Sequence, residues 1–309
     1  MAKEITTQAE NKVSIIGKLL NVNIRKGKAR ETGADYASVT YEVRVRQSYE
    51  GHEEVSDVMV ENTANMLIQK GPKAGQVNPA YENIVNMEKF VTAKNAGIDA
   101  ADTVVITRGE LVDNTYVSKQ SGKVIPQRRV RASFCARANN PEAEDIASFR
   151  ADIFIMSMTD EVDSEGTETG RLLIKGGLVG YGGRLGVLEF VVEDPSKVDF
   201  IRRTYEENQT GSFVGRIRDC VKNVVAKKTT GSWGEDIPDN APTAIHELII
   251  TGGAEMPYEE DFAYDPTDIR KAFNVRKAML EQKLEESRAR AEAPKKQAKS
   301  TSGWADDNF

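Results

Sequence analysis

Residues 36–46 read YASVTYEVRVR, and this stretch alternates between apolar and polar side chains. Val39, Tyr41, Val43 and Val45 fall on one parity, whereas serine, threonine, glutamate and arginine side chains fall on the other. A period of two with one apolar face is typical of a half-buried β-strand. We therefore expect a strand here, with Tyr41 in a core and the polar parity facing outward.

Similar patterns extend along most of the chain before about residue 265. Further strands are expected at residues 11–24, 55–60, 103–112, 128–138, 151–158, 186–193 and 244–251. Helices are expected at residues 63–71, 79–94, 195–208 and 269–290. In the first half the order is strand, strand, strand, helix, strand, strand. This is the order of an OB-fold, a small Greek-key barrel of five strands.

The pattern recurs in the second half. IIGKLL at residues 15–20 is echoed by IKGGLV at residues 174–179, and GELVD at residues 109–113 is echoed by GRIRD at residues 215–219. A glycine early in a barrel's first strand suits tight coiling, because a side chain would obstruct the bend. Chance is the alternative, since six-residue patterns of this kind are common in β-rich proteins. Residues 151–158 fit either barrel.

These patterns predict a mainly β chain with two OB-like Greek-key barrels, followed by a C-terminal helix and a disordered, acidic-tipped tail. The expected boundaries are residues 11–140 for the first barrel and 150–252 for the second. Residues 253–290 form an acidic linker and helix, and the Ala-, Lys-, Pro- and Ser-rich residues 291–309 form the tail.

Composition narrows the functional class. The chain has 309 residues, 39% hydrophobic and 29% charged, with a net charge of −6. Its length allows two modest domains, and the negative charge argues against a uniformly basic nucleic-acid binder. No segment has the apolar length of a membrane span or the pattern of a signal peptide. Two widely separated cysteines, Cys135 and Cys220, indicate a reducing compartment without a disulfide framework.

Catalytic chemistry is poorly represented. His52 and His246 have no partners at metal-ligand spacing, and both cysteines are interpreted as small packing residues. Glycines at residues 176–183 lack the Lys-Ser/Thr of a phosphate-binding loop, so they predict a turn or bulge. The acidic run at residues 160–168 reads as a solvated hairpin loop. We expect no catalytic residue, no metal and no cofactor.

Binding of single-stranded nucleic acid fits the strand faces better, because such proteins combine a cationic groove with aromatic rings that stack on bases. The outward parity of the expected strands carries arginines beside aromatic residues in both halves, although isolated outward arginines are often simply solvated. Phe134 and Phe190 are assigned to the cores. The candidate DNA-binding residues are Arg25, Lys26, Lys28, Arg30, Tyr36, Arg44, Arg46, Arg129, Arg131, Arg137, Arg216, Arg218, Lys227, Lys228 and Trp233.

Two of these groups lie in expected loops. The first four residues form a basic loop between the first two strands. Lys227, Lys228 and Trp233 lie in the connection between the last two strands of the second barrel. OB-folds use these two loops to bind oligonucleotides. An indole beside two lysines suits stacking on a base.

The C-terminus, GWADDNF at residues 303–309, forms a compact hook. The ring of Phe309 can enter an apolar pocket while Asp306, Asp307 and the terminal carboxylate pair with a basic rim. At this point the chain resembles the single-stranded DNA-binding proteins of bacteria and phages, whose acidic tail ends in Phe. It departs from their usual ending, which has more aspartates and an Ile-Pro before the Phe. Here Trp304-Ala305 and Asn308 stand instead.

The resemblance implies a non-enzymatic, sequence-tolerant binder that protects single-stranded DNA and acts in replication, recombination and repair. Its tail residues, Trp304, Asp306, Asp307 and Phe309, would recruit the partner proteins. Bacterial members carry one barrel and form tetramers, so two barrels suggest a monomer or homodimer, as in a phage-type protein. The expected location is the cytoplasm, or the host cytoplasm for a phage protein. The alternatives are a β-rich virion or assembly protein without DNA-binding activity and, less favoured, a nuclease.

Overall fold

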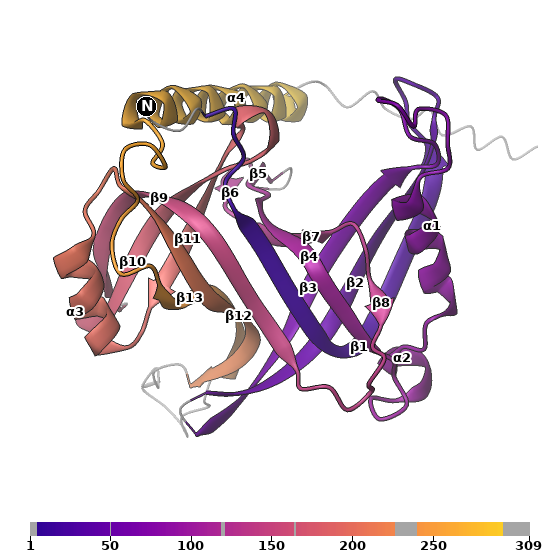
Figure 1. Ribbon diagram of the computed structural model, residues 1–309, viewed down its shortest axis with the longest axis horizontal. Helices are drawn as coiled ribbons and strands as arrows, with labels where there is room; N and C mark the ends of the chain where they lie inside the picture. The colour runs from indigo at the N-terminus through magenta and orange to yellow at the C-terminus, as the bar shows by residue number, and fades with distance from the viewer. Residues whose placement is uncertain (1–4, 50, 119–120, 164, 226–239, 293–309) are drawn as a thin grey trace, which may run out of the picture.

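The computed structural model describes residues 5–49, 51–118, 121–163, 165–225 and 240–292 (Figure 1). The fold is mainly β, with two barrels side by side and a C-terminal helix that lies along the second barrel and reaches the first at Asp113. One eleven-stranded sheet runs through both barrels. Among the described residues, no helix has the length and apolar character needed to cross a membrane.

The first barrel has the strand order of an OB-fold. Its five strands are β1 (Asn11–Lys28), β2 (Asp35–Tyr49), β3 (His52–Asn65), β4 (Thr103–Asp113) and β7 (Arg128–Ala132). β1, β2 and β3 pair antiparallel, β3 pairs with β7 in parallel, and β7 and β4 lead back antiparallel to β1. This closes the barrel. Between β3 and β4 lie α1 (Pro79–Asn86), η1 (Met87–Lys89) and α2 (Ala93–Ala96).

The second barrel repeats this plan. Its strands are β9 (Ile146–Val162), β10 (Glu168–Val179), β11 (Leu185–Val192), β12 (Thr210–Val225) and β13 (Asn240–Gly253), with α3 (Pro195–Thr204) between β11 and β12. β11 pairs in parallel with β13, and the other neighbours are antiparallel. The prediction of two OB-like barrels is confirmed.

One of the two sequence echoes is in register and the other is not. GELVD and GRIRD lie on β4 and β12, which are the fourth strands of their barrels. Residues 174–179 lie on β10, the second strand of its barrel, whereas residues 15–20 lie on β1, a first strand. The prediction that these two segments are equivalent is therefore wrong. The first strand of the second barrel is β9, which contains residues 151–158.

The barrels are joined through their first strands. The N-terminal halves of β1 and β9 pair antiparallel, from Asn11 opposite Ala151 to Ile16 opposite Ile146. On the same edges, the C-terminal half of β1 pairs with β2 and that of β9 with β10. Because equivalent strands meet antiparallel, the two barrels are related by an approximate two-fold rotation about the β1–β9 pair.

The fourth strands lock this arrangement reciprocally. Asp219 at the end of GRIRD donates its backbone N–H to Ser56 Oγ of the first barrel (3.2 Å). Asp113 at the end of GELVD accepts a hydrogen bond from the backbone N–H of Val187 in the second barrel (3.0 Å). The repeated aspartates therefore mark the interface between the barrels.

Helix ends follow ordinary capping rules. Asn78 accepts a hydrogen bond from Ala80 N at the start of α1 (3.0 Å), and Asp194 accepts one from Ser196 N at the start of α3 (2.8 Å). The helix expected at residues 63–71 is wrong. Residues 63–65 end β3, and Leu67 forms an isolated antiparallel bridge with Val77. Gly71, with φ of +86°, sits in the intervening turn, a backbone conformation that glycine adopts at low cost.

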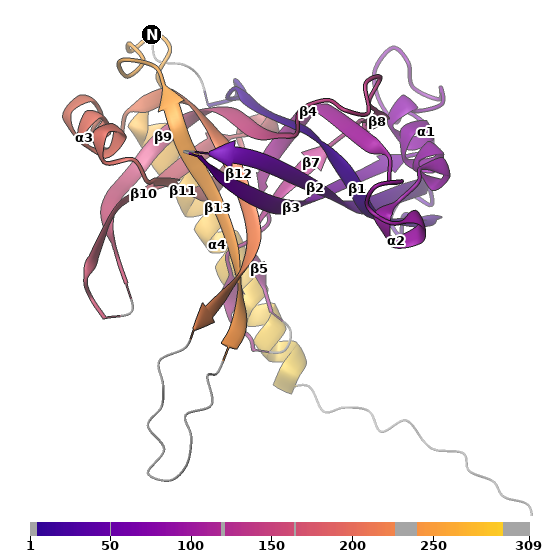
Figure 2. The same cartoon turned by 90° about the horizontal axis from the view of Figure 1, so that it is seen from below.

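Alternation along the strands fills the main core. Tyr41 and Phe190 are 1% and 0% exposed, which confirms their assignment to the cores. A second cluster of buried side chains, including Phe154 and Leu185, receives Ile269 at the start of α4 (Pro266–Glu292). Arg276 of α4 then forms an ion pair with Asp113 (2.6 Å), so the helix contacts both barrels (Figure 2).

The smaller elements border the barrels. They are the two-stranded β5 (Tyr116–Val117) and β6 (Val124–Ile125), the short β8 (Ala136–Arg137) on the edge of β4, and η2 (Tyr181–Gly183) between β10 and β11. The acidic connection expected at residues 160–168 is the turn between β9 and β10, and its described side chains are mostly exposed.

Candidate nucleic-acid interface

The basic residues expected between the first two strands lie at the end of β1 and just beyond it. All four are exposed: Arg25, Lys26, Lys28 and Arg30. Lys26 pairs with Glu88 (2.7 Å), and the hydrogen bond to that carboxylate raises the lysine pKa. Lys28 approaches Asp35 (4.0 Å). Within the described residues no ion pair involves Arg25 or Arg30, so both guanidinium charges are available at the surface.

On β2 the candidate residues differ in their exposure and in whether a carboxylate pairs with them. Arg44 donates two 2.7 Å hydrogen bonds to Asp57, which raise the pKa of Arg44 and pair its charge with a carboxylate. Arg46 is exposed at the side chain, although its backbone N–H donates to Asp145 (2.7 Å). Tyr36 is half-buried, with its ring over Gly27. A cationic strip on β2 therefore depends mainly on Arg46.

On β7, two candidate arginines share one carboxylate. Arg129 hydrogen-bonds to Glu61 (2.6 Å), and Arg131 lies 3.7 Å from the same side chain. Arg131 is about half exposed at 49% of its side-chain surface. Two positive charges face one negative charge, so this strand keeps a net positive charge on its outer side.

Phe134, expected in the core, is 48% exposed. The regular alternation stops between β7 and β8. Ala132 and Cys135 both point inward although they are three residues apart, so Ser133 and Phe134 both point outward. A break in strand pairing shifts the parity by one residue, and this places the ring on the surface. Cys135 is buried, which raises the pKa of its thiol to about 12 and fits a packing role.

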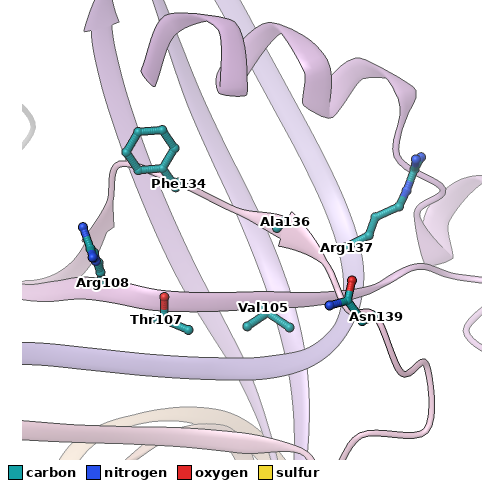
Figure 3. A pocket seen from close by; sticks show the side chains of 7 residues that line it. All are labelled: Val105, Thr107, Arg108, Phe134, Ala136, Arg137 and Asn139. Carbon is teal, nitrogen blue, oxygen red and sulfur yellow. The ribbon is translucent and has the colours of Figure 1, made fainter. Parts of the chain in front are cut away.

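The ring of Phe134 borders a surface pocket of about 460 Å³ (Figure 3). Val105, Thr107 and Ala136 form its floor, and Arg108 lies on the side nearer the ring. Arg108 is exposed, and no ion pair involves it within the described part of the chain. The pocket thus combines an exposed aromatic face with an arginine that no carboxylate neutralises.

Arg137 lines the same pocket, but its side chain extends away from Phe134 (Figure 3). Its guanidinium lies 4.6 Å from the centroid of the Phe90 ring and 2.7 Å from the Asp102 carboxylate. It also donates to the backbone carbonyl of Lys89. The contacts fix Arg137 against the helical segment and leave Arg108 as the freer cation beside the ring.

Arg216 and Arg218 on β12 are not on an open face, and the expectation that they are exposed is wrong. They are 7% and 8% exposed. Both point out of the second barrel, as their parity requires, but the extended β2–β3 hairpin of the first barrel covers them. Glu54 of β3 bonds to both, and the Tyr49 ring lies 4.1 Å from the Arg216 guanidinium.

A network of carboxylates surrounds these two arginines. Arg218 contacts Glu54 (3.0 Å), Glu193 (2.5 Å) and Glu247 (2.8 Å), and Arg216 contacts Glu54 (2.7 Å) and Glu193 (3.0 Å). Burial acts to lower the pKa of Arg218, but the hydrogen bonds that it donates to the three glutamates outweigh burial and hold the pKa above its ordinary value. We call these five residues the inter-barrel ion cluster; within it, Glu54 of the first barrel contacts both arginines of the second.

Seven candidate residues lie outside the described residues. They are Lys227, Lys228, Trp233, Trp304, Asp306, Asp307 and Phe309. Their proposed roles rest on the sequence.

Sequence reasoning missed Arg108, and it misjudged Phe134. The signal for Arg108 was present in β4, where the buried positions Val104 and Ile106 are followed by Gly109 and Leu111. The spacing lengthens from two to three at Thr107–Arg108, where the pairing of β4 with β1 shifts register. Such a bulge turns two successive side chains outward. Across the described ranges, no group of three or more His, Cys, Asp or Glu side chains is arranged to hold a metal ion.

The sequence model of the YorF family matches residues 9–286. The chain belongs to the YorF family. No curated protein sequence matches it.

Among solved structures, the wild-type single-stranded DNA binding protein from Thermus aquaticus is similar with a TM-score of 0.49 at 9% identity, covering 82% of this chain and 95% of that one. A deletion mutant of the same protein gives 0.48 at 11% identity, covering 84% and 98%. A replication protein A heterotrimer bound to single-stranded DNA gives 0.23 at 10% identity, covering 89% and 70%. All three TM-scores are below 0.5, so the description of two barrels rests on the strand pairings of this chain alone.

Proposed function

We propose that this YorF family chain binds single-stranded DNA with little sequence preference and acts by binding rather than by catalysis. The observation that supports this best is the exposed ring of Phe134 beside Arg108, in a surface pocket of about 460 Å³ on the first barrel. An exposed aromatic ring in the segment between β7 and β8 has no packing role that explains its position.

The pair has complementary chemistry for a single strand. Every base has a π-face, so stacking on Phe134 tolerates any base, at about 1–3 kcal/mol per stacked base. Arg108 adds a charge that can pair with a phosphate. In a duplex the bases already stack on one another, so the ring has no base face to contact. This favours single strands over duplex.

Other free cations of the first barrel extend the site. Arg25 near the end of β1, Arg30 just beyond it and Arg46 on β2 are exposed side chains that form no ion pair in the described part of the chain, although the Asp145 carboxylate lies near Arg46. Lys227, Lys228 and Trp233 would add the connection between the last two strands of the second barrel. Arg44, Arg129 and Arg131 contribute less, because Asp57 and Glu61 already pair with them.

The proposal is tested by titrating the protein with fluorescent oligo-dT and with duplex of equal length at two salt concentrations. We expect a preference for the single strand, and an affinity that falls steeply with salt as counterions are released. Phe134→Ala is expected to weaken binding about 5- to 150-fold. The matched control is Phe200→Ala, which removes a ring of similar exposure, 40%, from α3.

Equal affinity for duplex and single strand would contradict the proposal, as would equal binding by the two phenylalanine variants. Absence of binding at low salt would favour the alternative of a virion or assembly protein.

We further propose that the C-terminal residues recruit proteins of replication, recombination or repair, with Phe309 as the apolar anchor and Asp306 and Asp307 as the charged rim. Deletion of residues 306–309 should abolish capture of such proteins from host extract and leave DNA affinity equal or slightly higher. Phe309→Ala alone should lose most of the capture. A truncated chain that captures the same proteins would contradict the recruiting role.

A further inference from the structure

A second surface pocket, of about 530 Å³, lies where the two barrels join. It occupies the outer side of the β1–β9 pair and continues onto β12 and β13. The residues that matter here are Lys12, Ser14, Ser148, Arg150, Val214 and Thr251. We call this pocket the junction groove.

The junction groove and the Phe134 pocket have no lining residue in common, but they lie on neighbouring strands of one sheet. Ser14 of β1 lies beside Thr107 and Arg108, at the point where the β1–β4 register shifts. Ser14 also pairs directly with Ser148 of β9. One outward sheet face therefore runs from β8 across β4, β1 and β9 to β12 and β13. With neighbouring strands about 4.8 Å apart, these five steps span roughly 24 Å.

The groove offers contacts for a phosphodiester backbone rather than for bases. Arg150 is exposed, and no ion pair involves it among the described residues. Lys12 pairs with Glu10 (2.6 Å), so Arg150 supplies the free charge. Three hydroxyl side chains, of Ser14, Ser148 and Thr251, line the floor and can donate hydrogen bonds to phosphate oxygens. No tyrosine or tryptophan lines it, and the one aromatic lining residue, Phe149, is 3% exposed.

We propose that one continuous single strand of nucleic acid crosses from the first barrel to the second through the junction groove. A base stacks on Phe134, and the phosphates that follow contact Arg108, then Arg150 and the hydroxyls. This inference rests on the proposed function and adds the path of the strand. It makes the two barrels one binding surface, with the β1–β9 pair as its middle.

The test is a length series of fluorescent oligo-dT, from about 3 to about 15 nucleotides, titrated against full-length variants. Arg150→Glu is compared with Arg203→Glu, which makes the same charge change at an exposed position on α3, outside the groove. Arg150→Gln serves as the milder variant. Because Arg150 is exposed, all three should unfold at the same denaturant concentration as wild type.

We expect the shortest oligonucleotides, which can occupy only the Phe134 pocket, to bind wild type and Arg150→Glu with similar affinity. As the oligonucleotide lengthens enough to cross the junction, wild type and Arg203→Glu should gain affinity. Arg150→Glu should fall behind by about tenfold or more, and Arg150→Gln by less, because a charged contact to phosphate is lost.

Arg150 variants that bind every length as well as Arg203→Glu does would overturn the path. If Phe134→Ala still weakened binding in that case, the proposed function would stand without it. Failure of wild type to bind any oligonucleotide would contradict both the proposed function and the path of the strand.

Discussion

Arg216 and Arg218 on β12 and Arg108 on β4 occupy related places, since each lies in or beside the repeated Gly-x-x-x-Asp segment of a fourth barrel strand and points out of its barrel. Their surroundings differ completely. The two β12 arginines are 7% and 8% exposed among three glutamates, whereas Arg108 is exposed beside Phe134. Strand parity therefore decides whether a side chain leaves its own barrel, and the docking of the second barrel decides whether it reaches solvent.

The difference arises from the β2–β3 hairpin. It extends beyond the first barrel and covers β12, bringing Glu54 and Tyr49 onto the arginines. On the other barrel, the corresponding end of β4 meets β11 and α4 through Asp113. Arg108 lies before this contact region. The repeated Gly-x-x-x-Asp segment thus contributes to the interface in both barrels. The candidate binding residue Arg108 lies one residue before this segment on β4.

The largest expected effect comes from opening the inter-barrel ion cluster. Arg218→Ala leaves three glutamates, Glu54, Glu193 and Glu247, with only Arg216 and Arg171 as partners. One negative charge is then uncompensated in a largely buried site, which should cost about 3–5 kcal/mol of unfolding free energy. Arg108→Ala, its exposed counterpart, should stay within about 0.5 kcal/mol of wild type. Urea unfolding followed by circular dichroism gives both values. Equal losses in the two variants would remove the contrast between buried and exposed arginines.

A smaller effect is expected from the glycines that open the two pentapeptides. A Cβ on Gly215 would lie 2.1 Å from the Ile249 carbonyl oxygen and 2.5 Å from the Phe149 ring, so the backbone or the ring must move. A Cβ on Gly109 would lie 3.1 Å from Val13 Cβ, which needs only a slight shift. We expect Gly215→Ala to cost about 3 kcal/mol and Gly109→Ala about 1 kcal/mol in the same unfolding assay. The reverse order would show that the two segments are not packed as described.

Much of the fold was predictable because both barrels are built from alternating strands in the OB order. The fourth-strand repeat was also visible, since Gly and Asp recur at the same spacing. Two interruptions of the alternation were harder to predict. At Thr107–Arg108 and between Ala132 and Cys135 the inward spacing grows from two residues to three, and Phe134 moves from the expected core to the surface. A prediction that assumes strict alternation assigns the wrong face to every side chain after such an interruption.

The burial of Arg216 and Arg218 could not be predicted from the pattern of their own strand, for another reason. Their burial depends on Glu54, which is more than 160 residues away in sequence and belongs to the other barrel. The pairing of β1 with β9 that brings these parts together has no local signature. By contrast, the exposed residues of the β1–β2 region, such as Arg25 and Arg30, were placed on the surface as expected because no distant element covers them.

The pH dependence of the ion cluster is a third way to test the comparison. Burial acts to raise the pKa of Glu54, but hydrogen bonds from Arg218 and Arg216 outweigh it and hold the pKa below 4.5. A carboxylate with a lowered pKa in the folded state contributes stability above its unfolded value, and this contribution is lost as the pH falls through the folded pKa. Wild type should therefore lose the contribution of Glu54 to its stability as the pH falls below about 4.5.

Glu54→Gln should be less stable than wild type at pH 7, and the gap should narrow towards acid. Thermal unfolding at several pH values from 3 to 7 measures it, with Glu281→Gln on exposed α4 as the control. A gap that stays constant with pH would show that the Glu54 charge contributes nothing to the cluster.

The smallest effect concerns the salt dependence of oligonucleotide binding, and it separates the two kinds of arginine most directly. A contact between one arginine and one phosphate releases about 0.7 of a counterion from a single strand, so Arg108→Ala should reduce the slope of log affinity against log salt by about 0.7. Arg216→Met should leave the slope unchanged, because its guanidinium is already neutralised by Glu54 and Glu193 and covered by the first barrel. The measurement is an oligo-dT titration at four or more salt concentrations, at a temperature where unfolding curves show both variants to be folded. A slope that falls in Arg216→Met as much as in Arg108→Ala would mean that the β12 arginines reach the DNA. The β2–β3 hairpin would then have to move away from β12 on binding, because Glu54 and Tyr49 of this hairpin cover those side chains.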